Sequence, residues 1–168
     1  MPSFPISAFQ AVVLSGLANL SALAMAQPIS VEKPDVIQFG ATLEALTEDL
    51  EPLCSSLETR RFDPPRLPAE THDQIDCQGF GYFGDDRLAE FVFMDGTLQL
   101  VWILVDAEDL DGLEKRFAET YGARTHETDD VVAYADDFAA VRRDIPEALF
   151  YSESVAHLAE MRFGERLE

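Results

Sequence analysis

The sequence predicts an α+β fold, a two-layer sandwich in which helices lie mainly on one face of an antiparallel sheet. Three observations lead to this fold class. Asp95-Gly96 separates two runs of alternating residues, leucines recur at helical spacing over 41–57, and a second helix is again followed by short strands. The predicted element order is therefore αβββ-αβββ-α.

The N-terminal segment 1–26 predicts a secretory signal peptide. It contains no charged side chain, has a mostly apolar run, and ends in the small-x-small pattern Ala24-Met25-Ala26. The alternative is an uncleaved membrane anchor, because the apolar run approaches the ~20 residues that span a bilayer. We expect a single α+β domain over 27–168, periplasmic or secreted, with 27–39 as a loosely ordered lead-in.

The charge of the chain limits its partners. It carries 32 acidic and 12 basic residues, a formal net charge of −20 at pH 7. Such a surface repels nucleic acid and anionic membranes, so neither is an expected partner. We also expect no stable membrane span after signal cleavage. The remaining candidates are an unknown envelope protein or a small anionic ligand.

The first helix is predicted over Ala41–Leu57, where leucines follow one another at spacings of three and four. Thr42 is a suitable N-cap. Pro52 removes a backbone donor, so we expect a kink or a break near Asp49. Loop 59–73 follows and contains three prolines.

Residues 74–105 predict three consecutive strands. Asp95-Gly96 suits a type I′ hairpin, because both residues tolerate positive φ. A two-residue turn would place Phe93 opposite Leu98, and Ala89 opposite Trp102. The predicted core face then holds Ala89, Phe91, Phe93, Leu98, Leu100, Trp102 and Leu104. In the first strand, Gly79 and Gly81 predict a bulge or a close backbone approach, which could bring Cys77, Phe80 and Tyr82 to the same face.

A second helix is predicted from its apolar stripe over 106–121, and Gly122 is suited to end it. Turn residues then separate three short strand candidates. A last helix is predicted near the C-terminus. These elements are Val131–Ala135, Phe138–Arg143 and Ala148–Tyr151 for the strands, and Glu153–Phe163 for the helix.

The two cysteines, Cys54 and Cys77, are predicted to form a disulfide bond, because an even count in an exported chain favours pairing. This bond would join the first helix to the first strand of the sheet. The alternative is a redox pair, although the spacing differs from Cys-x-x-Cys.

The loop over 59–73 holds the candidate ligand-binding residues Arg60, Arg61 and Arg66. Two interpretations stay open. The arginines either pair with the acidic surface of the chain, or bind an anion or carboxylate through their planar forks. Any recognition surface is expected on this loop and the neighbouring face of the sheet.

No catalytic residues are predicted. The glycines over 79–84 match G-x-G-x-x-G, but a strand rather than a helix follows, which argues against dinucleotide binding. His72, His126 and His157 lack zinc-ligand spacing, and His72 is expected in an exposed loop. No metal and no cofactor is therefore expected. Trp102 is expected in the core, with a pocket as the alternative.

The leading functional hypothesis is a small exported binding or accessory module without catalytic activity. It rests on the signal peptide, the paired cysteines and the lack of a catalytic motif. The alternatives are a small carboxylate-dependent hydrolase, which would need converging acids in a pocket, and a structural envelope protein.

Overall fold

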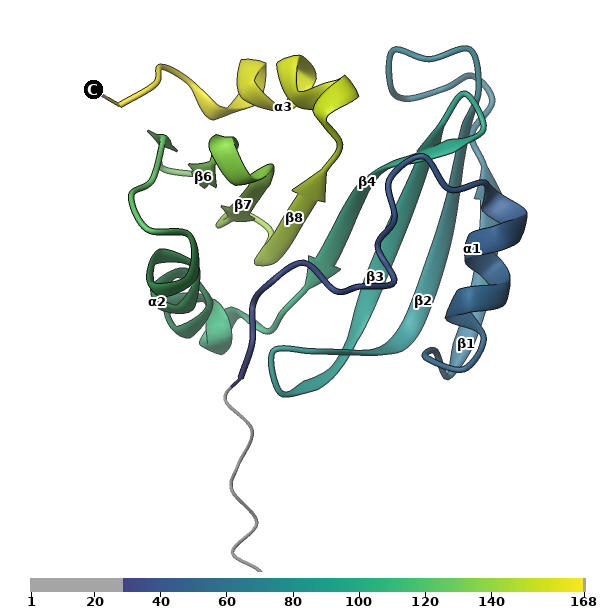
Figure 1. Cartoon of the computed structure of the whole chain (residues 1–168), viewed down its shortest axis with the longest axis horizontal. Coiled ribbons are helices and arrows are strands. Elements are labelled where there is room, and N and C mark those ends of the chain that lie inside the picture. The colour runs from purple at the N-terminus through teal and green to yellow at the C-terminus, as the bar shows by residue number, and fades with distance from the viewer. Residues whose placement is uncertain (1–28, 168) are drawn as a thin grey trace, which may run out of the picture.

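The computed structural model describes residues 29–167, and the predicted signal peptide at 1–26 lies outside them. Within this range, eight strands form one antiparallel sheet, accompanied by three α-helices (Figure 1). The α+β class with an antiparallel sheet is confirmed. The elements are α1 (Leu43–Leu50), β1 (Ser56–Arg61), β2 (His72–Tyr82), β3 (Asp85–Met94), β4 (Thr97–Leu104), α2 (Leu110–Tyr121), β5 (His126–Glu127), β6 (Val131–Tyr134), β7 (Ala139–Arg142), β8 (Glu147–Tyr151) and α3 (Ala156–Phe163).

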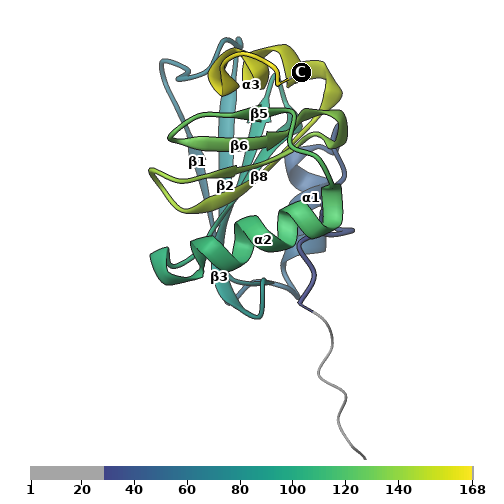
Figure 2. The same cartoon turned by 90° about the vertical axis from the view of Figure 1, so that its left-hand side faces the viewer.

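The sheet consists of two meanders of four strands each, whereas the predicted order has three strands in each. The additional strands are β1 and β5, which form the two edges of the sheet. The strand order is β1-β2-β3-β4-β8-β7-β6-β5, so the last strands of the two meanders, β4 and β8, meet in the middle. Figure 2 shows that the strands of the second meander run across those of the first, which makes the sheet strongly twisted.

The two faces of the sheet carry separate apolar clusters. Helices α1 and α2 pack with the larger cluster, while α3 packs with the smaller one. Alternation along β8 illustrates the division, because Phe150 belongs to the larger cluster and its neighbours Leu149 and Tyr151 belong to the smaller. The helices contribute Leu46, Leu50, Leu113 and Phe117 to the larger cluster, and Ala159 and Phe163 to the smaller.

The region after α1 differs from the prediction. Thr42 caps α1 as expected, since its hydroxyl accepts the N–H of Ala45 at 3.3 Å. The helix ends at Leu50, which confirms the break expected from Pro52. The chain then forms β1, so Leu57 lies in a strand and not in the helix.

The glycine bulge in β2 is confirmed. The register with β3 shifts between Gln78 and Phe80, and Gly79 has a φ of 75°. A Cβ at this position would lie 2.8 Å from Oγ of Ser55 and 3.2 Å from its backbone nitrogen, so the backbones approach closely as well. Cys77 and Phe80, on either side of the bulge, are both buried in the larger cluster.

The register of the β3–β4 hairpin is correct only next to its turn. Asp95 and Gly96 both have positive φ, as predicted, and Phe93 lies opposite Leu98. Beyond this point Gln99 has no partner on β3, because Val92 pairs with Leu100. This second bulge reverses the rest of β4. Val101 and Ile103 therefore face the larger cluster, whereas Leu100 and Trp102, predicted in the core face, lie on the opposite face.

The predicted lead-in packs against the core through residues between 31 and 39. Val31 and Ile37 are each 1% exposed. The hydroxyls of Tyr82 and Tyr121 donate to the backbone oxygen of Val31 at 3.1 and 3.2 Å. These contacts join the lead-in to β2 and to α2.

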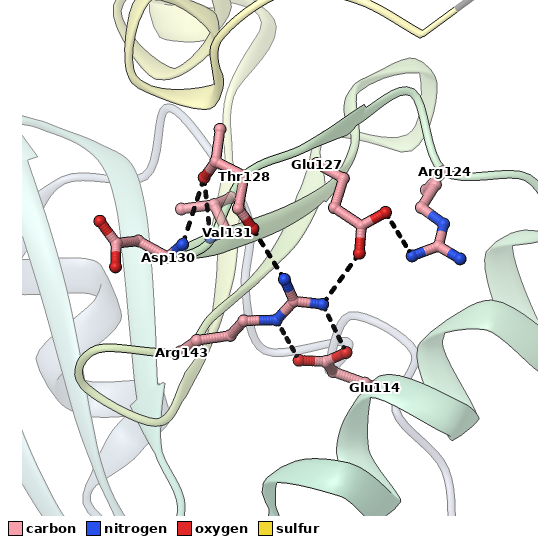
Figure 3. Close-up of polar contacts among 7 residues, drawn as sticks. All are labelled: Glu114, Arg124, Glu127, Thr128, Asp130, Val131 and Arg143. Atoms are coloured by element: carbon pink, nitrogen blue, oxygen red, sulfur yellow. Dashed lines mark hydrogen bonds and ion pairs between the residues drawn. The ribbon is translucent and has the colours of Figure 1, made fainter.

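Helix α2 is attached to the second meander through Arg143, which follows β7 (Figure 3). The Arg143 guanidinium donates to both carboxylate oxygens of Glu114 on α2, at 2.6 and 2.9 Å. It also donates to Glu127 on β5 at 3.1 Å and to the backbone oxygen of Thr128 at 2.7 Å. These bonds to carboxylates raise the pKa of Arg143.

The predicted disulfide joins Cys54 and Cys77, whose Cα atoms lie 5.4 Å apart. It connects the turn after α1 to the centre of β2. Within residues 29–167, no helix combines the length and apolar character that crossing a membrane requires.

Reducing this disulfide should lower the free energy of unfolding. The two bonded cysteines are 23 positions apart in the sequence. Closing a loop of that length stabilises a fold by about 3.4 kcal/mol in the chain-entropy model. Urea unfolding with and without dithiothreitol, and of the variant Cys54→Ser/Cys77→Ser, measures the loss. Equal midpoints in the two conditions would contradict it.

Replacing Gly79 by Ala should also destabilise the fold. The left-handed φ costs an L-residue about 1–2 kcal/mol, and the new methyl group would crowd Ser55. Gly81→Ala is the matched control, because a Cβ there has no neighbour within 4 Å among the residues described. A urea midpoint for Gly79→Ala equal to that of Gly81→Ala would argue against the bulge.

Candidate functional site

A cavity of about 510 Å³ lies on the face of the sheet opposite α1 and α2. This volume is in the ~300–1,000 Å³ range of small-molecule sites. The cavity is bounded by the sheet, by α3, and by the β1–β2 loop over 62–71. Figure 1 shows α3 and this loop at the same end of the molecule.

The floor of the cavity comes from the central strands and is largely apolar. The bulge at Gln99 turns Leu100 and Trp102 towards it. Leu149 on β8 pairs with Trp102 and continues the floor across the junction of the two meanders. The other apolar lining residues are Leu67, Pro68, Val92, Met94, Val131, Ala140, Val155, Leu158, Ala159, Met161 and Phe163.

Hydrogen bonds from the β3–β4 hairpin hold both walls of the cavity. Oδ1 of Asp95 accepts the backbone N–H groups of Glu70 and Thr71 in the β1–β2 loop, at 2.7 and 3.0 Å. The backbone oxygen of Gln99 accepts the N–H of Ser152, which begins the segment leading to α3, at 2.9 Å. The Ser152 hydroxyl donates to the Gln99 side chain.

The prediction of an exposed loop is wrong for His72. This residue lies in the wall of the cavity. It begins β2 and is 4% exposed, since the β1–β2 loop covers it. Burial, followed by the charge of Arg66, lowers the pKa of His72. Its Nδ1 accepts the backbone N–H of Arg66 at 3.3 Å, which places the proton of the neutral ring on Nε2. Nε2 is buried without a hydrogen-bond partner among the residues described.

The three arginines predicted as binding residues occupy different environments. Arg60 and Arg61 lie in β1, outside the loop, and both pair with carboxylates of β2. Arg61 makes a two-pronged contact with Asp73, at 2.7 and 2.9 Å, and lowers the pKa of that carboxyl group. Arg66 alone of the three lines the cavity.

One end of the cavity carries a cluster of charged residues that the sequence analysis did not identify. Arg142 lies over the Trp102 ring, 5.5 Å from its centroid, and lines the cavity together with Glu90. Burial raises the pKa of Glu90, and the neighbouring charge of Asp76 raises it further. Nothing local marked these residues as a cluster, because they come from separate strands.

Glu147 is buried next to Arg142 and belongs to the same cluster. Its side chain is 5% exposed, and its Oε1 lies 2.8 Å from an Arg142 guanidinium nitrogen. This oxygen nevertheless accepts no well-aligned hydrogen bond within the described range. Burial therefore raises the pKa of Glu147 to about 7, against the opposing effect of Arg142.

Other sequence motifs do not contribute to this cavity. Residues 79–84 end β2 and continue through a turn into β3, as expected for a chance match to the dinucleotide motif. Over residues 29–167, no three His, Cys, Asp or Glu side chains come together in an arrangement that could hold a metal ion.

Comparison of the chain with protein-family models, with curated proteins and with solved structures finds no match in any of the three.

The free energy of unfolding should depend on pH through Glu147. Because the folded-state pKa of about 7 exceeds the ordinary value of 4.5, the contribution of protonated Glu147 is complete below pH 4.5 and is lost as pH rises through 7. The wild type should therefore lose about 3 kcal/mol relative to Glu147→Gln between pH 4.5 and 7.5. Urea unfolding across this range measures the difference.

The control for this experiment is Glu153→Gln, at an exposed position. It should keep the pH dependence of the wild type. Parallel stability curves for the wild type and Glu147→Gln would refute the assignment.

Proposed function

We propose that this protein is an exported binding module that holds a small, largely apolar ligand in the cavity between the sheet, the β1–β2 loop and α3. The observation that carries the proposal is the cavity itself. It is concave and has an apolar lining with a few polar side chains, the usual composition of a small-molecule site. The protein binds its ligand without transforming it.

Export to the periplasm or secretion forms part of the proposal. The Cys54–Cys77 disulfide is typical of oxidising compartments. The uncharged segment 1–26 with its small-x-small ending supports the same location.

The alternative of a carboxylate-dependent hydrolase is favoured by one observation, the raised pKa values of Glu90 and Glu147. Among the described residues that line the cavity, however, Glu90 is the single carboxyl group, and Glu147 lies outside the lining. An acid and a base both facing a bound substrate would require two such groups. The geometry therefore supports binding better than hydrolysis.

Filling the cavity should weaken ligand binding. Leu100→Trp enlarges a half-buried residue of the floor and should weaken binding of the neutral fluorophore N-phenyl-1-naphthylamine about tenfold or more. Fluorescence titration of the purified protein measures the affinity. The matched control is Leu53→Trp, whose leucine is 45% exposed and lies outside the cavity lining.

The proposal requires saturable binding by the wild type and by Leu53→Trp. Circular dichroism and urea unfolding establish that Leu100→Trp is folded when it is titrated. Wild-type affinity in the folded Leu100→Trp variant, or no saturable binding by the wild type, would overturn the assignment of the cavity.

A further inference from the structure

The arginines of the chain differ in whether the protein itself neutralises them. Ten of the 12 basic residues are arginines. Within residues 29–167, eight of these arginines form ion pairs with Asp or Glu, and Arg66 and Arg162 do not. Both exceptions line the cavity, Arg66 from the β1–β2 loop and Arg162 from α3. The chain has 32 acidic residues that could pair with these two arginines. Because neither arginine pairs with one of them within the described range, we infer that an anion that is not part of the protein binds beside the cavity.

The Arg66 guanidinium is held in place without being neutralised. It lies over the Phe62 ring, 4.3 Å from the centroid, and Phe62 in turn lies 4.4 Å from the His72 ring. Contact with an aromatic face orients the planar guanidinium while leaving its N–H groups free to donate. The backbone N–H of Arg66 also donates to His72, which joins the backbone of this residue to the same stack.

A third donor in the wall lacks a partner. Nε2 of His72 carries the proton of the neutral ring, is buried, and donates to no acceptor in the described part of the chain. A buried donor without an acceptor destabilises the empty protein, and an acceptor on a ligand would remove that cost. Arg66 and His72 therefore offer donors that suit a ligand with hydrogen-bond acceptors and a negative charge.

We propose that the ligand is an amphipathic carboxylate, whose apolar body occupies the cavity and whose head group binds between Arg66 and Arg162. This assignment rests on the proposed binding function and adds the chemical class of the ligand. The planar fork of arginine matches a carboxylate, and such charge-assisted hydrogen bonds are stronger than those between neutral groups. His72 is assigned as a further donor to the same head group.

The charge of the whole molecule makes this recognition selective. A net charge of −20 repels anions in general, so an anionic ligand binds only where positive charge is concentrated. A neutral ligand of the same shape would gain nothing from either arginine. A cationic ligand would be repelled by both, with Glu90 as the only carboxylate among the described lining residues.

The test compares ligands that share a ten-carbon chain and differ in the head group. Decanoate, decanol and decylamine are used below their aggregation limits to displace N-phenyl-1-naphthylamine from the purified protein. Decanoate should bind at least about tenfold more tightly than decanol, and decylamine should bind most weakly. The variant Arg66→Gln/Arg162→Gln should lose the preference for decanoate, so that decanoate and decanol bind it with equal affinity.

The control variant is Arg116→Gln/Arg124→Gln, which removes the same number of charges from arginines outside the cavity lining. It should keep the tenfold preference. Equal affinity for decanoate and decanol, or a preference that survives in Arg66→Gln/Arg162→Gln, would overturn the carboxylate assignment alone. A wild type that binds neither the fluorophore nor any of the three ligands would overturn the proposed function as well.

Discussion

A single unpaired residue, Gln99, determines which face of the sheet receives the second half of β4. Before it, Leu98 points into the larger cluster; after it, Leu100 and Trp102 point to the opposite face and form the floor of the cavity. The same residue binds Ser152 through its backbone and its side chain, which fixes the start of the segment leading to α3. The floor and one wall of the candidate site therefore depend on this bulge.

Charge is distributed so that most cations neutralise acids within the fold. Arg87 is buried among Asp85, Asp106 and Asp109, and Arg143 joins α2 to the second meander (Figure 3). A buried or partly buried guanidinium needs such partners, because an unpaired charge away from water is strongly unfavourable. Arg66 and Arg162 are exposed and can stay unpaired at low cost. Exposure alone does not set these two arginines apart, because the Arg61 side chain is 71% exposed and still pairs with Asp73.

The features predicted correctly are those with a local physical cause. Asp95-Gly96 allows positive φ, Gly79 permits the bulge in β2, and Pro52 ends α1, each because of the properties of the residue itself. The bulge at Gln99 has no such local signal, since its partner Ser152 is 53 positions away. Strand β1 was missed because an exposed edge strand with the sequence SLETRR needs no apolar alternation.

The candidate site belongs to neither meander alone. The first supplies the β1–β2 loop and most of the floor, while the second supplies Leu149, Ala140, Arg142 and the helix that closes the opposite side. Strands β4 and β8 pair in the middle of the sheet. Side chains of both meanders therefore lie on one face and line the same cavity. Of the predicted binding loop, Arg66 reached this site and Arg60 and Arg61 did not, because the strand that holds them directs them to the acids of β2. The prolines of this segment predict the loop between β1 and β2, and that loop supplies Arg66, Leu67 and Pro68 to the cavity lining.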